Sequence, residues 1–135
     1  MLTEQLLGRE ALEALTSGSG NVAVGWLALT ANSTSDYNTA VGYQALSAVN
    51  GDGAGGNTGV GFQAGGSLTD GVYSTYVGYQ AGLGSTASDN YNTAVGALAL
   101  KLVTSGDGNT CIGYSAGDFL QSGGDNTLIG SGNDV

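Results

Sequence analysis

A short alternation of polar and apolar residues recurs along almost the whole chain. Its clearest copy runs from Asn38 to Leu46 and reads Asn-Thr-Ala-Val-Gly-Tyr-Gln-Ala-Leu. In every copy the fourth residue is Val or Ile, and a glycine follows it. These repeat glycines are Gly25, Gly42, Gly61, Gly78, Gly96, Gly113 and Gly130. They follow one another at intervals of 17 to 19 residues, and a fixed period of about 20 residues is typical of a solenoid of stacked coils.

Each copy predicts one strand of about four or five residues, because the segment is too short for a helix and contains a β-branched residue. Side chains alternate along a strand, so the Thr and the Val of a copy share one face. We expect the Val/Ile column to stack into a dry core ladder made of Val24, Val41, Val60, Val77, Val95, Ile112 and Ile129. The third-position residues face the other way and are candidates for contacts between chains: Ala23, Ala40, Gly59, Tyr76, Ala94, Cys111 and Leu128.

The glycine that follows the Val/Ile column predicts a backbone constraint. It indicates either a positive φ at a corner or the close approach of another backbone. The asparagine that opens most copies predicts an amide ladder along the stack. Between copies lie stretches rich in Gly, Ser, Asn and Asp, which are turn compositions. They carry most of the length variation, as loops on one edge of a solenoid do.

The first residues differ from the rest and are rich in helix formers. We expect residues 1–17 to form a short N-terminal α-helix and docking segment, followed by a seven-repeat β-solenoid over residues 18–135. Leu7, Ala11, Ala14 and Leu15 fall at helical spacing and would form the apolar docking stripe. Such a short helix is marginal alone, so it would dock on the first coil, on a symmetry mate or on a larger assembly.

Charge and composition exclude several function classes. The 135 residues carry 11 acidic and two basic side chains, giving a net charge of -9. That balance does not suit nucleic-acid binding, and no apolar run approaches the ~20 residues needed for membrane insertion. Cys111 is the one cysteine and there is no histidine, so a Cys-His nucleophile and a multi-cysteine metal site are excluded. No acid pair recurs, and we expect the protein not to be an enzyme.

Two further candidates lie outside the strands. Aspartates precede most copies, and a calcium site is conceivable there because Ca²⁺ prefers several converging oxygens. Their positions drift relative to the repeat, which favours solvated turns and no cofactor. An aromatic column follows the repeat glycine and consists of Trp26, Tyr43, Phe62, Tyr79 and Tyr114. It is either a seam between chains of a trimer or a stripe for stacking glycans.

The threonine column allows one more alternative, an ice-binding row of hydroxyls. Thr39, Thr58, Thr75, Thr93, Thr110 and Thr127 repeat at the second position of the copies. Against ice binding, Thr shares its face with the expected Val core, and Val22 replaces it in the first copy.

The run Asn-Thr-Ala-Val-Gly-Tyr-Gln-Ala resembles the repeats in the head domains of trimeric autotransporter adhesins of the YadA type. It is also similar to repeats of phage tail fibres and related virion proteins. The resemblance covers residues 21–130 and implies a left-handed parallel β-roll with three chains side by side, although the coil here is longer. It implies a structural and adhesive role at a virion surface or an extracellular cell surface. The protein would be a fibre or capsid-decoration component with receptor-binding loops; the alternative is a bacterial adhesin head.

Overall fold

A computed structural model describes residues 5–86 and 90–132 of the chain. Eight short strands form one parallel sheet in which each strand pairs with its neighbours in sequence. The strands are β1 (Gln5–Leu7), β2 (Val22–Val24), β3 (Thr39–Val41), β4 (Thr58–Val60), β5 (Thr75–Val77), β6 (Thr93–Val95), β7 (Thr110–Ile112) and β8 (Thr127–Ile129). The predicted all-β parallel solenoid is therefore confirmed.

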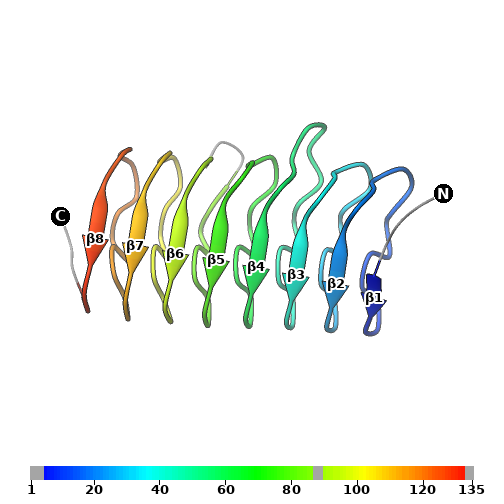
Figure 1. Ribbon diagram of the computed structural model, residues 1–135, viewed down its shortest axis with the longest axis horizontal. Coiled ribbons are helices and arrows are strands. Elements are labelled where there is room, and N and C mark those ends of the chain that lie inside the picture. The colour runs from blue at the N-terminus through cyan, green and yellow to red at the C-terminus, as the bar shows by residue number, and fades with distance from the viewer. Residues whose placement is uncertain (1–4, 87–89, 133–135) are drawn as a thin grey trace.

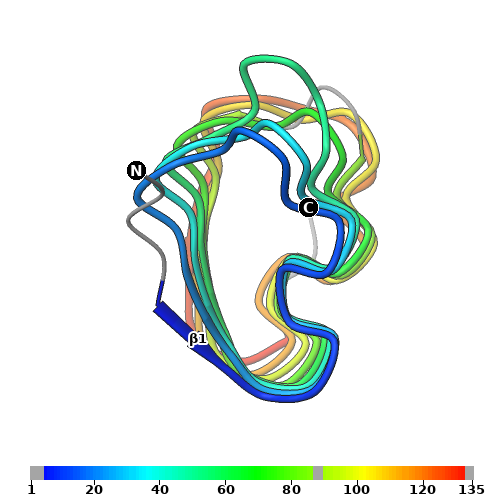
Figure 2. The same ribbon diagram turned by 90° about the vertical axis from the view of Figure 1, so that its right-hand side faces the viewer.

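Each coil contributes one strand and returns to the sheet through turns. The coils stand in a row along the long axis (Figure 1), and a view along that row shows them superimposed, with the strands on one straight side (Figure 2). The register keeps equivalent residues opposite each other, as in Thr39 against Thr58 and Val41 against Val60. No helix occurs in the described ranges, so none there could span a membrane.

The core is built from the middle residue of each strand, and the predicted Val/Ile core ladder is wrong. The inward residues of β2 to β8 are all buried: Ala23, Ala40, Gly59, Tyr76, Ala94, Cys111 and Leu128. From the opposite wall of the coil, leucines such as Leu29, Leu46 and Leu100 point into the interior, and they have no exposed surface. The Val/Ile column, which is Val24, Val41, Val60, Val77, Val95, Ile112 and Ile129, is partly or largely exposed.

The physical reason lies in the length of the strand. A strand of three residues sends only its middle side chain to one face, so Thr and Val necessarily share the other. Because the leucines of the opposite wall already occupy the narrow interior, small middle residues fit there. The residues that we expected to contact other chains are thus the ones that fill the coil.

Core volumes compensate each other from coil to coil. Tyr76 is fully buried, and its hydroxyl lies 2.7 Å from Ser85 Oγ. Glycines 65 and 82 stand where other coils carry a leucine. A Cβ on Gly65 would lie 2.7 Å from a ring carbon of Tyr76, and one on Gly82 would overlap the same ring. The tyrosine therefore fills the volume that two missing leucines leave, at the close packing expected of a core.

Both predicted reasons for the repeat glycine are confirmed. The repeat glycines, Gly25, Gly42, Gly61, Gly78, Gly96, Gly113 and Gly130, have φ values between 124° and 135°. A Cβ on Gly42 would stand 2.5 Å from the carbonyl oxygen of Gly61 in the next coil. The corner after each strand thus needs both an unusual φ and the absence of a side chain.

The predicted amide ladder is also present, on the inner side of the coil. The backbone N–H of Asn57 donates to Asn38 Oδ1 at 3.0 Å, and its side-chain amide donates to the same oxygen at 3.1 Å and to the Gly71 carbonyl at 2.7 Å. Equivalent bonds link Asn38 to Asn21 and Asn109 to Asn92. Buried polar groups must be paired, and here each coil satisfies those of its neighbour.

The predicted N-terminal helix is wrong. Residues 5–7 form β1, which pairs with β2, and residues 8–14 form turns like those of later coils. Gly8 has a φ of 142° and stands at the corner as the repeat glycines do. Ala11 and Leu12 are buried in the core, whereas Ala14, from the predicted docking stripe of Leu7, Ala11, Ala14 and Leu15, is exposed. Pairing with β2 prevails over a marginal helix, and residues 5–17 belong to the solenoid; residues 1–4 of the predicted helix lie outside the described residues.

Candidate functional site

The outer face of the sheet is flat and uncharged. Two columns of side chains point outward from strands β2 to β8, and together we call them the outer face. One column is Val22 and the six threonines that align with it, and the other is the Val/Ile column. Exposure reaches 36% for Val41, 39% for Ile112 and 68% for Ile129. At a strand spacing of about 4.8 Å, these strands span roughly 29 Å. The protein thus exposes an ordered strip of methyl and hydroxyl groups.

The aromatic column borders the outer face, because each ring follows the corner glycine directly. Tyr43 and Phe62 stack with ring centroids 5.2 Å apart, and Phe62 stacks on Tyr79 at the same distance. Trp26 meets Tyr43 edge-on at 5.5 Å, and the Arg9 guanidinium lies 6.0 Å from the Trp26 ring centroid. The rings of this column are thus in contact from Trp26 to Tyr79, and its use as a seam between chains or as a stripe for glycans stays a prediction. Tyr114 is exposed too but stands apart, because Ala97 occupies the position between it and Tyr79.

A second aromatic column was not predicted from the sequence. Tyr37, Tyr73 and Tyr91 each stand one residue before the first residue of a copy, and that shared position was the signal that could have revealed them. We call these three residues the tyrosine column. Tyr73 and Tyr91 stack with centroids 5.9 Å apart. All three rings are mostly exposed, by 60% to 70%.

The tyrosine column occupies a backbone position that favours glycine. Its residues have φ of 58°, 52° and 58°, and the same position holds Gly20, Gly56 and Gly108 in other coils, with φ of 67° to 69°. A left-handed conformation costs a non-glycine residue about 1–2 kcal/mol. Leu29 and Leu46 also have positive φ, but their complete burial offsets the strain. The exposed tyrosines instead pack on the glycine of the preceding coil: a Cβ on Gly20 would lie 2.7 Å from a ring carbon of Tyr37, and one on Gly56 would lie 2.6 Å from a ring carbon of Tyr73.

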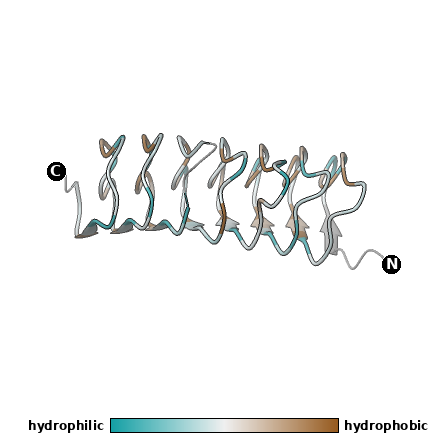
Figure 3. Ribbon diagram, turned by 90° about the horizontal axis from the view of Figure 1, so that it is seen from above, coloured by the Kyte–Doolittle hydropathy of each residue, from teal (hydrophilic) through white to brown (hydrophobic). Residues whose placement is uncertain are grey.

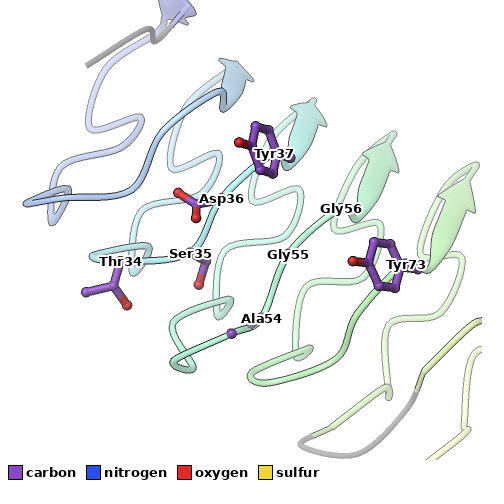
Figure 4. A pocket seen from close by; sticks show the side chains of 9 residues that line it. Thr34, Ser35, Asp36, Tyr37, Ala54, Gly55, Gly56 and Tyr73 are labelled. Carbon is purple, nitrogen blue, oxygen red and sulfur yellow. The ribbon is translucent and has the colours of Figure 1, made fainter. Parts of the chain in front are cut away.

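A hollow of about 410 Å³ lies between Tyr37 and Tyr73. Its floor is the backbone of Gly55 and Gly56, so the two rings form opposite walls over a coil that has no side chain at this position (Figure 4). Thr34, Ser35, Asp36, Gly53 and Ala54 complete the lining. We call this feature the Tyr37–Tyr73 hollow. It is the size of a small-molecule pocket.

The loop aspartates form bonds between coils. Asp36 Oδ1 accepts hydrogen bonds from the Ser19 N–H at 2.7 Å and from Ser19 Oγ at 3.1 Å. Asp107 Oδ1 accepts from the Asn90 N–H at 2.7 Å. Within residues 5–86 and 90–132, no three acidic or thiol side chains gather as a metal site would require. Asp36 and Asp107 therefore each join their own loop to a neighbouring one.

Cys111 is the middle residue of β7 and is buried. Burial raises the pKa of its thiol, because desolvation disfavours the charged thiolate. The thiolate is the nucleophilic form, so the side chain is held in its unreactive, protonated state at neutral pH. Cys111 packs close to Gly117, where a Cβ would lie 2.8 Å from its sulfur, and so it serves the core.

Comparisons of the chain with protein-family models, with curated proteins and with solved structures find no match. The arguments about function that follow therefore use the geometry of the solenoid and the chemistry of its surfaces.

Proposed function

We propose that the protein is a non-enzymatic structural and adhesive element whose outer face packs against two further copies of the chain. The homotrimer would form a section of a virion fibre or a capsid decoration, with its loops turned outward toward a host receptor. The alternative setting is the head of a bacterial surface adhesin. The observation that carries the proposal is the exposed outer face, free of charge in a protein of net charge -9.

The distribution of charge supports association through this face. The outer face contains no acidic residue, whereas Asp36, Asp52, Asp70 and Asp107 lie in loops away from the strands. Three acidic chains can approach one another through a neutral surface, whereas contact through the loops would bring like charges together. The neighbouring aromatic column extends the strip, and an ordered apolar strip of this length is typical of an interaction surface.

The shape of the coil supports the same arrangement. Viewed from the N-terminal end, the chain winds anticlockwise as it recedes (Figure 2), which supports the left-handed β-roll that we propose. The strands occupy one straight side of the cross-section (Figure 2), and seen from above they follow one another along a single side of the row of coils (Figure 3). A flat face suits repeated side-by-side contacts around an axis.

The mass in solution tests the assembly. One chain has a mass of 13.2 kDa, and sedimentation equilibrium is expected to give three times that value. Val60→Lys and Ile112→Lys place like charges on the outer face and are expected to convert the trimer to monomer. Ser67→Lys adds the same charge at an exposed turn residue away from the sheet and should leave the mass unchanged. A wild-type monomer at every concentration would exclude the proposal.

A second candidate function, ice binding, is favoured by one specific observation. The sequence argument against it placed the threonines on the core side, but the structure places Thr and Val together on the exposed face. Their side chains form two parallel rows spaced by about 4.8 Å from strand to strand. A monomer that shows thermal hysteresis, with Thr75→Leu reducing it and Ser67→Lys not, would support this function over the fibre.

A further inference from the structure

We propose that the Tyr37–Tyr73 hollow binds one neutral pyranose ring of a glycan, held between the two tyrosine rings. The site is distinct from the outer face and from the aromatic column. It combines two aromatic walls, a floor of backbone and polar lining groups. That arrangement suits a ring with apolar C–H faces and a rim of hydroxyl groups.

The spacing of the walls is set by the coil. Tyr37 and Tyr73 belong to the coils of β3 and β5, two coil spacings apart, which is roughly 10 Å. The aromatic column shows what fits such an interval, because Phe62 lies between Tyr43 and Tyr79 at 5.2 Å from each centroid. In the hollow, Gly56 provides no ring of its own. A ligand ring is therefore expected to take the place that Phe62 takes in the aromatic column.

The coil between the walls carries a second departure from the repeat. It is the longest one, with 19 residues between equivalent asparagines, and its extra residues form the loop that protrudes between β3 and β4 (Figure 1). Gly53 and Ala54 of that loop line the hollow. The loss of a ring and the added loop thus occur together in one coil, and both shape the same hollow.

The exposed walls are consistent with a binding role. Tyr37 and Tyr73 hold left-handed backbone conformations that glycine adopts without strain, yet their rings are 70% and 66% exposed. Gly56 is the glycine of this column that has a tyrosine on both sides, since Gly108 is followed by Asp125.

The polar lining and the net charge select the ligand class. Asp36 holds Ser19 through Oδ1, and its Oδ2 makes no hydrogen bond to the described residues, so it can accept one from a sugar hydroxyl. Asp52 lies close by, where it accepts from Thr34 at 3.1 Å. Two carboxylates in a protein of net charge -9 disfavour phosphates and uronic acids. Neutral hexoses and N-acetylhexosamines therefore fit best.

Saturation-transfer NMR on the full chain tests the site, with cellotriose, the N-acetylglucosamine trimer, digalacturonate and N-acetyltyrosine amide as probes. We expect transfer to at least one neutral sugar and none to digalacturonate. Tyr37→Gly and Tyr73→Gly introduce the residue that other coils carry at this position, so the fold is retained. Each should weaken sugar binding roughly tenfold, as expected for the loss of a stacked ring. Tyr91→Gly is the matched control, because it removes a ring of the same column that does not line the hollow.

Several results would overturn the assignment: no transfer to either neutral sugar, binding of digalacturonate as strong as that of the neutral sugars, or binding of the tyrosine amide alone. Equal weakening by Tyr91→Gly would place binding on the tyrosine column as a whole. The site lies within one chain and does not require the proposed trimer. Sedimentation of the same samples therefore separates a failure of this site from a failure of the assembly.

Discussion

The inward and outward columns of the same strands follow different rules. Inward, the residue changes from coil to coil, from Gly59 to Tyr76 to Ala94, and the opposite wall compensates for each change. Outward, the Val/Ile column hardly changes from β2 to β8. Core packing explains variation with compensation, but it does not explain constancy on an exposed face. The constant column therefore reports on something outside the coil, and this is why the outer face carries our proposal.

The largest expected effect comes from breaking the compensation at Tyr76. Tyr76→Ala is expected to lower the free energy of unfolding by about 3–5 kcal/mol, because it opens a cavity between two glycines. Gly82→Leu alone should also destabilise, since its Cβ would overlap the Tyr76 ring. Urea unfolding of the double variant is the decisive measurement. The protein with both Tyr76→Ala and Gly82→Leu has a small inward residue and a leucine on the opposite wall, as the coils with Leu46 and Leu100 do. It should therefore recover much of the free energy of unfolding that Tyr76→Ala loses. If the two single effects simply add, the compensation is contradicted.

A smaller effect distinguishes the two faces within β4. Gly59→Ala places a Cβ 2.7 Å from Leu46 Cγ, and such overpacking is expected to cost about 1–3 kcal/mol. Val60 is the next residue, and its side chain lies on the outer face. Val60→Ala should therefore lower the free energy of unfolding by less than about 1 kcal/mol in a monomer. Thermal unfolding at two protein concentrations gives both values. If the Val60→Ala cost rises with concentration, the outer face is buried by association; equal costs for both variants in the dilute monomer would contradict the assignment of faces.

The sequence was sufficient to predict a parallel β-solenoid, but not which side chains of each strand point into the coil and which point out. The period, the corner glycines and the asparagine column each have a local physical cause that one copy already displays. Strand alternation separates Ala40 from Val41 but does not say which one faces inward. Small residues such as Ala40 predicted a contact with another chain. They in fact point inward, because Leu29 and Leu46 from the opposite wall already fill most of the interior of the coil.

The N-terminal segment shows how local propensity can mislead. Residues 5–17 contain good helix formers, and these dominated the interpretation. The repeat was nevertheless present, because Gly8 precedes Gly25 by the usual interval and Ala11 and Leu12 align with Ala28 and Leu29. Tertiary pairing prevails over propensity when a template strand lies alongside. The Tyr37–Tyr73 hollow was beyond sequence reasoning, because it depends on which coils lie two spacings apart.

The smallest expected effect concerns the inward column at Cys111. Burial raises the pKa of this thiol, whereas the unfolded chain exposes it with an ordinary pKa of about 8.5. Above that value the unfolded state loses the proton while the folded state keeps it. Stability therefore falls as the pH rises through the interval between the two pKa values, and it is unaffected below it.

Comparison with Cys111→Ala isolates this effect from the tyrosines, which also titrate in alkaline solution. The free energies of unfolding of the two proteins should differ by a constant amount up to about pH 8 and then converge as the wild type loses stability. A difference that stays constant to higher pH would mean that the thiol ionises equally in both states. Cys111 would then be open to solvent, and the middle residue of β7 could not belong to the closed interior that the inward column defines.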